Sequence, residues 1–232
     1  MPEWRTYTLS DFLLFSPKTY YRLFELYNRA IWPAQIVFVL AGIGIGSLLR
    51  RGPSRVAWAL LGACWLWVGI VFQARHYARV NWAAVYFAWA FVFEAALLVW
   101  IGTIRSEGQL EDARRGSRRI RPAWQIGTAW RIGVAMFAFA LAAEPLVGLI
   151  SGRRISQIEV FGATPDPTAV ATLGLLLPIR GVPGWAAAAL PTLWCLISGA
   201  TLLAMKSPEA AVPFLAALVA TGARITTRGR RV

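Results

Sequence analysis

The sequence predicts an all-α integral membrane protein, a helical bundle of about seven transmembrane helices with an amphipathic interfacial helix before them. Hydrophobic residues make up 57% of the 232 residues and charged residues only 15%, whereas soluble domains average about 45–50% and 25%. The apolar residues form long blocks and do not alternate with polar ones, which is the pattern of helices solvated by lipid. Many of the 12 Trp lie at block ends, where amphipathic rings favour the membrane–water interface.

Residues 1–31 form the predicted interfacial segment. Ser16 and Pro17 indicate a helix start, a hydroxyl cap followed by a proline that needs no N–H there. Apolar side chains then share one helical face: Tyr20, Leu23, Phe24, Tyr27 and Ile31. The opposite face carries Arg22 and a predicted i,i+4 pair, Glu25 with Arg29. Such a helix either lies along the bilayer surface or packs over the mouth of the bundle. The segment lacks the pattern of a cleavable signal peptide.

The region 32–227 contains seven apolar blocks that predict the spans. We expect them near 32–49, 56–74, 80–104, 132–152, 167–180, 183–205 and 208–225. The fifth block is short, because its uncharged part would extend only about 20 Å as a helix. It is therefore either a span that ends at Arg180 or a re-entrant half-helix. The seventh reaches full length if Glu209 and Arg224 hold their charges among the lipid headgroups.

Two sets of small residues inside the blocks concern packing. Gly42, Gly44 and Gly46 in the first block should let a neighbouring helix approach closely. Cys64 and Cys195 both lie in apolar surroundings and far apart in sequence. We interpret them as small core residues, neither a disulfide framework nor a metal site.

The distribution of basic residues predicts the orientation. With seven spans and the N-terminus outside, most of the 24 Lys and Arg lie on the inner side, as the positive-inside rule requires. A re-entrant fifth block would reverse the later loops and leave the majority outside. The sequence therefore favours an outer N-terminus, a cytoplasmic C-terminus, a basic cytoplasmic loop at 105–124 and a basic tail at 228–232.

Polar residues gather where the second and third spans meet. They are Arg75, His76, Arg79 and Asn81. Two guanidinium groups on one helical face beside an imidazole are typical of an anion or proton site. The alternative is structural: the arginines reach to headgroups and His76 bonds a loop carbonyl.

Two acidic residues lie in the interior of predicted spans, away from the span ends. A carboxylate at that depth costs about 2.5–3.5 kcal/mol, and such residues usually face the bundle interior or water. Glu94 lies deep in the third span, and Glu144 precedes Pro145 in the fourth. A proline there weakens the helix ladder and frees a carbonyl group. Because the two spans are antiparallel neighbours, the carboxyl groups either share a functional cavity or take part in structural pairs.

The segment EVFGATPDPT, residues 159–168, predicts a loop followed by a helix start. Asp166 has the chemistry of an N-cap and Pro167 that of the first helical residue. Together with Thr168, Asp166 at an outer mouth is a candidate for binding a cation or orienting a substrate. Ordinary helix capping is the alternative.

Several chemistries are disfavoured, and no cofactor or metal is expected. One histidine supports neither a bis-histidine haem nor a three-histidine zinc site, and no nucleotide-binding or hydrolase motif appears. Enzymatic activity stays open but is not favoured. Because the basic excess falls in loops and tails, membrane lipids are the expected partners and nucleic acid is not. The sequence leaves open a homo-oligomer or a larger membrane complex.

Four fragments occur in a characteristic order. They are WRTYTLSDFLLFSP…YYRLFELYNRAIWPAQ, RHYARVNWAAVYFAWAF, EVFGATPDPTAVATLGLLL and PTLWCLISGATLLAM. In this order the chain resembles a family of uncharacterised bacterial multi-pass membrane proteins, a domain of unknown function. The resemblance excludes only the 105–124 loop and the tail. The resemblance implies a bacterial inner-membrane location, and it carries no known activity over to this chain. It draws attention to His76, Asn81, Trp82, Asp166, Pro167 and Thr168.

The leading functional hypothesis is a small-molecule or ion transporter or channel. Its polar pathway would be bounded by His76, Glu94, Glu144 and Asp166. The alternative is a non-catalytic subunit or assembly factor of a larger complex, with the basic loop facing a cytoplasmic partner or anionic lipid. A third hypothesis is an enzyme acting on a lipid or quinone with His76 as base.

Overall fold

The computed structural model describes residues 15–52, 54–114 and 127–228, and side chains within 15–52, 54–104 and 127–226. These ranges form helices joined by turns, with no strand among them. The α-helices are α1 Pro17–Ala30, α2 Ala34–Arg51, α3 Arg55–Trp67, α4 Ala84–Arg114, α5 Thr128–Ala138, α6 Glu144–Ile150, α7 Pro165–Leu176, α8 Gly181–Ala204 and α9 Ala211–Arg228. The predicted all-α class is confirmed.

Two π-helical segments interrupt the long helices. Val68–His76 continues α3, and Phe139–Ala143 joins α5 to α6. The second one directly precedes Glu144 and Pro145. Because Pro145 has no N–H to bond the preceding turn, the ladder widens there, as the sequence predicts. The first segment ends just before Tyr77, a residue of the candidate site described below.

Six helical stretches are long and apolar enough to cross a membrane. They are 34–51, 55–79, 84–104, 128–150, 181–204 and 208–226. The expected fifth span is not among them. In its place stands α7, which has 12 residues, all of them buried, and a length of about 18 Å. The structure therefore supports six candidate spans and does not confirm the count of seven.

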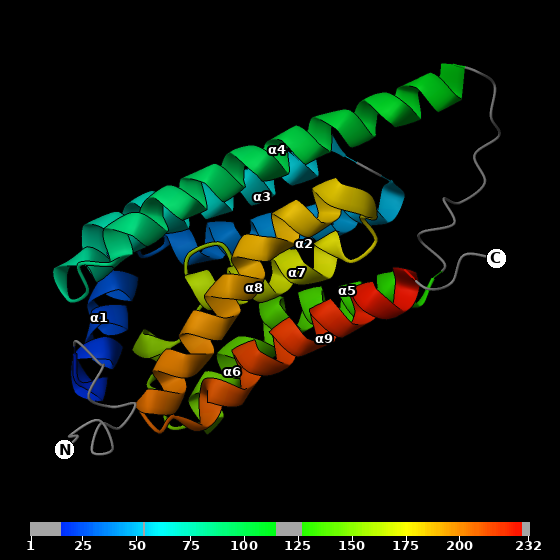
Figure 1. The fold of residues 1–232 in the computed structure, drawn as a ribbon. Helices are drawn as coiled ribbons and strands as arrows, with labels where there is room; N and C mark the ends of the chain where they lie inside the picture. The colour runs from blue at the N-terminus through cyan, green and yellow to red at the C-terminus, as the bar shows by residue number, and fades with distance from the viewer. Residues whose placement is uncertain (1–14, 53, 115–126, 229–232) are drawn as a thin grey trace.

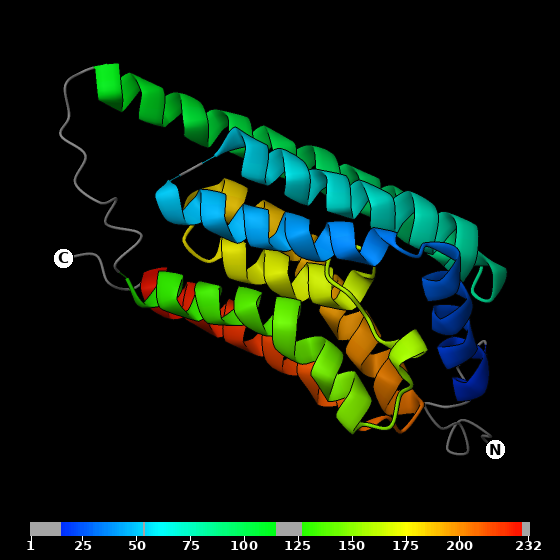
Figure 2. The ribbon, with the colours of Figure 1, turned by 180° about the vertical axis from the view of Figure 1, so that it is seen from behind.

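The helices lie in three layers (Figures 1 and 2). One layer holds α3 and α4, the opposite one holds α5, α6 and α9, and α2, α7 and α8 lie between them. The crossing of α5 and α7 is very close: a Cβ atom added to Gly174 would lie 2.5 Å from the Gly133 carbonyl oxygen. Glycine at both positions lets α7 sit inside the bundle without a gap.

The helix α1 packs across one end of the bundle, and the C-terminal end of α9 lies at the opposite end (Figure 1). Ser16 caps α1 through the Thr19 N–H, as predicted. The Tyr27 hydroxyl donates to the Ala163 carbonyl at 2.6 Å and accepts from the Trp67 indole at 3.0 Å. These contacts show α1 packed over the bundle mouth, while its contact with a bilayer surface stays a prediction.

The surface of α1 also follows the sequence pattern. Glu25 pairs with Arg29 at 2.7 Å, as predicted, and additionally with Arg22 at 2.8 Å. The hydrogen bond from Arg22 is the main cause that lowers the pKa of Glu25. Among the glycines of α2, Gly42 and Gly46 face Leu141 and Phe137 closely, whereas Gly44 has open space around it.

Glu209 and Arg224 correct the prediction for the seventh block. Neither side chain reaches outward, because both are buried. The guanidinium of Arg224 donates to the Leu176 and Ile179 carbonyls, at and just after the C-terminal end of α7. Glu209 pairs with Arg153. The last helix is therefore anchored by inward charges and not by lipid headgroups.

The predicted basic loop is partly helical. The backbone of α4 continues from Ile104 to Arg114, and this end projects beyond the neighbouring helices (Figure 1). Residues 115–124 and the tail after Arg228 lie outside the described residues. Both cysteines are buried and free, as expected.

Candidate functional site

An acidic cluster surrounds one arginine inside the bundle, at the end where α1 lies. Gly152 has φ +91° and ends α6, so the chain turns back and places Arg153 inward, with its side chain only 3% exposed. The guanidinium bonds Glu159 at 2.9 Å and also pairs with Glu209. It lies 4.9 Å from the Tyr21 ring centre, in cation–π contact.

Two more carboxyl groups lie beside the Arg153 guanidinium group. Glu144 and Asp166 line a cavity of about 20 Å³ together with Arg153, Glu159 and Glu209, which is room for about one water molecule. The Oε2 atom of Glu144 is buried and has no hydrogen-bond partner within the described part of the chain. Four carboxyl groups thus line one small cavity with a single guanidinium group, which pairs with Glu159 and Glu209. Because like charges at this spacing cannot all ionise in a buried site, the cluster must retain protons.

Glu159 shows this effect outside the six candidate spans. Burial, followed by the negative charge of the nearby Asp166, raises the pKa of its carboxyl group to about 8, although Arg153 opposes the shift. A carboxyl group with that pKa exchanges its proton near neutral pH. The cluster is therefore suited to binding and releasing protons.

Asp166 corrects the capping prediction. The helix begins two residues earlier than predicted, at Pro165, and its N-cap Thr164 makes no side-chain cap. The Asp166 carboxylate instead accepts hydrogen bonds from the Trp194 indole at 2.7 Å and the Ser198 hydroxyl at 2.5 Å, both on α8. Its neighbour Thr168 bonds backbone groups of its own segment and has a structural role.

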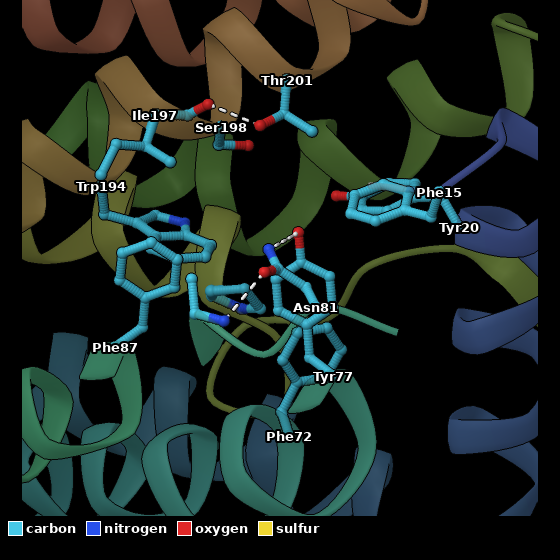
Figure 3. A pocket seen from close by; sticks show the side chains of 12 residues that line it. Phe15, Tyr20, Phe72, Tyr77, Asn81, Phe87, Trp194, Ile197, Ser198 and Thr201 are labelled. Carbon is cyan, nitrogen blue, oxygen red and sulfur yellow. Dashed lines mark hydrogen bonds between the residues drawn. The ribbon is translucent and has the colours of Figure 1, made fainter. Parts of the chain in front are cut away.

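Trp194 and Ser198 also line a second cavity, of about 190 Å³, on the other side of this contact. Figure 3 shows this aromatic pocket. It is lined by Phe15, Tyr20, Phe72, Tyr77, Asn81, Ala83, Phe87, Pro165, Trp194, Ile197, Ser198 and Thr201. The carboxylate of Asp166 therefore stands behind one wall of the aromatic pocket and on the wall of the acidic cavity.

The predicted residue Asn81 belongs to this pocket. Its amide nitrogen donates to the Tyr77 hydroxyl at 3.2 Å, and its oxygen accepts from the Ala83 N–H at 3.0 Å. Tyr20 lies on the side of the pocket away from Trp194 and Phe87 (Figure 3). Burial, followed by the negative charges of Glu159 and Asp166, raises the pKa of the Tyr20 hydroxyl, which places Tyr20 within electrostatic reach of the acidic cluster.

His76 and its arginine neighbours lie elsewhere. The His76 Nδ1 atom is 2.7 Å from the Val71 carbonyl oxygen, and its ring packs edge-on against Tyr27. This is close to the structural alternative, although the carbonyl belongs to the π-helical segment and not to a loop. His76 and Arg79 line an open cleft of about 790 Å³ beside α1. Arg75 is exposed and does not line that cleft.

Glu94 is the most isolated of the predicted site residues. It is fully buried, and neither carboxyl oxygen has a hydrogen-bond partner among the described residues. None of the four cavities described for the molecule includes it. The structure thus brings Glu144 and Asp166 together and leaves Glu94 and His76 apart from them.

The comparisons with known proteins concern the whole bundle. A family model described as a family of unknown function (DUF6064) matches residues 17–229. The chain belongs to this family. It is also 36% identical over 58 residues to the uncharacterized protein gp19 of Escherichia phage Mu, a match that covers 23% of the chain. The chain spans about half of that relative, 48% of its length. No solved structure matches.

The DUF6064 match agrees with the family resemblance in the sequence and adds no activity. Within the described part of this DUF6064 chain, no group of three or more His, Cys, Asp or Glu side chains is placed to hold a metal ion.

Sequence reasoning missed Arg153, Glu159, Glu209, Trp194 and Ser198 as site residues. Arg153 and Glu159 are six residues apart in a segment that the sequence places near the bundle mouth. This short separation of opposite charges was the signal that could have identified them. Glu209 comes from a distant turn, and its pairing with Arg153 is a tertiary contact that no local pattern encodes.

Proposed function

We propose that this protein is a small transporter of the bacterial inner membrane in which the acidic cluster carries protons. The observation that supports this most strongly is that four carboxyl groups line one small cavity with a single buried guanidinium group, which pairs with two of them. Ionisable residues inside a membrane bundle are costly and mark ion or proton pathways by default. The acidic cluster holds the bound protons, and the aromatic pocket binds the solute next to the cluster.

The pathway in this proposal differs from the one expected from the sequence. It runs from the aromatic pocket, through the hydrogen bonds of Trp194 and Ser198, to Asp166 and then to Glu144. Glu94 and His76 are left out because they line neither cavity. In this proposal the segment that ends in α7 also passes from one face of the bundle to the other, so that the N-terminus lies outside and the C-terminus in the cytoplasm, as the distribution of basic residues favours. The positions of α1 and of the C-terminal end of α9 at opposite ends of the bundle support this (Figure 1).

A second candidate function is that of a non-catalytic subunit of a larger membrane complex. The projecting end of α4 supports it, because a helix of 31 residues exceeds the length that the bilayer needs. Affinity purification in a mild detergent separates the two functions. A partner chain present in a fixed ratio favours the subunit role, and transport by the pure protein favours the first.

Proton movement in proteoliposomes tests the proposal. A pH-sensitive dye inside the vesicles should report flux by the wild type under a potassium-diffusion potential. Glu144→Gln and Glu159→Gln should lower the flux at least tenfold, a loss typical of removing a proton-transfer group. Glu94→Gln is the matched control, because it neutralises another buried carboxyl group outside the cluster. Equal flux in all four proteins would refute the proposal.

A further inference from the structure

The aromatic pocket has a composition that favours positive charge. Six of its lining side chains are aromatic: Phe15, Tyr20, Phe72, Tyr77, Phe87 and Trp194. The faces of such rings carry negative potential and attract cations, most strongly those with little hydration, such as methylated ammonium groups. No Lys, Arg or His belongs to the described residues that line the pocket, so no cation of the protein competes for these rings.

Two hydroxyl groups of the pocket wall also favour a cation. The Ser198 hydroxyl donates its hydrogen to Asp166, and the Thr201 hydroxyl donates its hydrogen to the Ile197 carbonyl (Figure 3). A hydroxyl group that has given its hydrogen away can offer only oxygen lone pairs to a ligand. Ser198 and Thr201 are therefore acceptors toward the pocket.

The charge behind the pocket is also negative. The Asp166 carboxylate is bonded to Trp194 and Ser198, two side chains of the pocket wall. In a buried setting, a carboxylate acts over several ångströms because little water screens it. The indole ring of Trp194 is further polarised, because its N–H donates to that carboxylate.

From these observations we infer that the aromatic pocket binds a small organic ammonium cation. The inference rests on the proposed function and names the class of its solute. A volume of about 190 Å³ limits the ligand to the size of a methylated amine or an amino alcohol. The ammonium group lies against the rings, and its charge is balanced by Asp166 through Trp194 and Ser198.

Equilibrium binding to the purified full-length protein in detergent tests this inference. The probe is radiolabelled choline, with tetramethylammonium and the uncharged choline isostere 3,3-dimethylbutan-1-ol as competitors. Choline should bind saturably, tetramethylammonium should displace it, and the isostere should be at least about tenfold weaker. Absence of saturable choline binding, or equal competition by the isostere, would overturn the inference.

Three variants sharpen the test. Phe87→Leu removes a ring from the pocket and should weaken choline binding about tenfold. Phe93→Leu is its matched control, because Phe93 lies on the same helix and is 68% exposed. Asp166→Asn should also weaken binding, and Phe87→Leu decides the matter if that variant does not fold. Wild-type affinity in Phe87→Leu would contradict the inference.

The failure of this inference is distinguishable from the failure of the proposed function. The dye measurement of proton flux contains no organic cation, and the binding measurement needs no membrane. Choline binding without proton flux would remove only the proposed function. Proton flux without choline binding would remove only the assignment of the solute.

Discussion

Arg153 pairs with Glu209, and this contact ties the turn after α6 to the start of α9. Both side chains are almost fully buried. A buried charge is stable only while its partner remains, because its lost hydration is not otherwise replaced. The pair therefore makes the position of α9 depend on the acidic cluster.

Arg153→Gln should be strongly destabilising. It removes the guanidinium group that pairs with Glu159 and Glu209, and breaking a buried pair typically costs about 3–5 kcal/mol. Thermal unfolding in detergent measures the effect. Arg154→Gln is the control, because Arg154 is the exposed neighbour and its loss should change stability by less than about 0.5 kcal/mol. Equal unfolding temperatures for the two variants would contradict this account.

Gly174→Ala should destabilise the packing of α5 on α7. The new methyl group would lie 2.5 Å from the Gly133 carbonyl oxygen, and such overpacking costs about 1–3 kcal/mol. Gly44→Ala provides the comparison, because a Cβ atom there meets nothing within 4 Å and alanine is the better helix former. The unfolding temperature should therefore fall in Gly174→Ala and rise slightly in Gly44→Ala. A stable Gly174→Ala protein would mean that these helices are farther apart.

Tyr27→Phe should loosen the attachment of α1. It deprives the Ala163 carbonyl and the Trp67 indole of their shared partner, which costs about 1–3 kcal/mol when the groups stay buried. Limited proteolysis of the N-terminal segment should be faster in this variant. Tyr86→Phe changes a 67% exposed tyrosine and should behave as wild type. If both variants resist proteolysis equally, the hydroxyl bridge does not hold α1.

Stability should fall as the pH rises toward 8. The Glu159 pKa is raised to about 8, whereas an unfolded Glu has a pKa of about 4.3. Between these values the folded state binds the extra proton, so that raising the pH within this window costs stability, by up to about 1.4 kcal/mol per pH unit. Unfolding temperatures at pH 6 and pH 8 measure the slope. Glu159→Gln should flatten it, and an unchanged slope would show that another group titrates.

The sequence predicted the helical class, the cap of α1 and the Glu25–Arg29 pair because each depends on neighbours within a few residues. It also identified Glu144, Asn81 and Asp166, because carboxyl and amide groups beside apolar blocks stand out. It missed the true partners of Asp166, since Trp194 and Ser198 approach from another helix. It also missed the inward turn of Glu209 and Arg224, because charges at the ends of an apolar block fit lipid headgroups equally well.

The length of the fifth block shows another limit of the sequence. Its composition indicated a short membrane span or a re-entrant half-helix, whereas α7 has 12 residues that are all buried inside the bundle. A polar segment before it, including Glu159, is buried by the surrounding helices. Hydropathy measures what a segment prefers as solvent and does not distinguish lipid from a protein interior.

The central claim is that the acidic cluster holds exchangeable protons inside the folded bundle. Infrared difference spectroscopy during a pH titration measures this directly, because a protonated carboxyl group has a C=O stretching band that a carboxylate lacks. The account predicts a protonated-carboxyl band in the wild type that disappears as the pH rises through about 8, the pKa of Glu159, and is weakened in Glu159→Gln. A spectrum without that band near neutral pH, or a band unaffected by Glu159→Gln and Glu144→Gln, would contradict it.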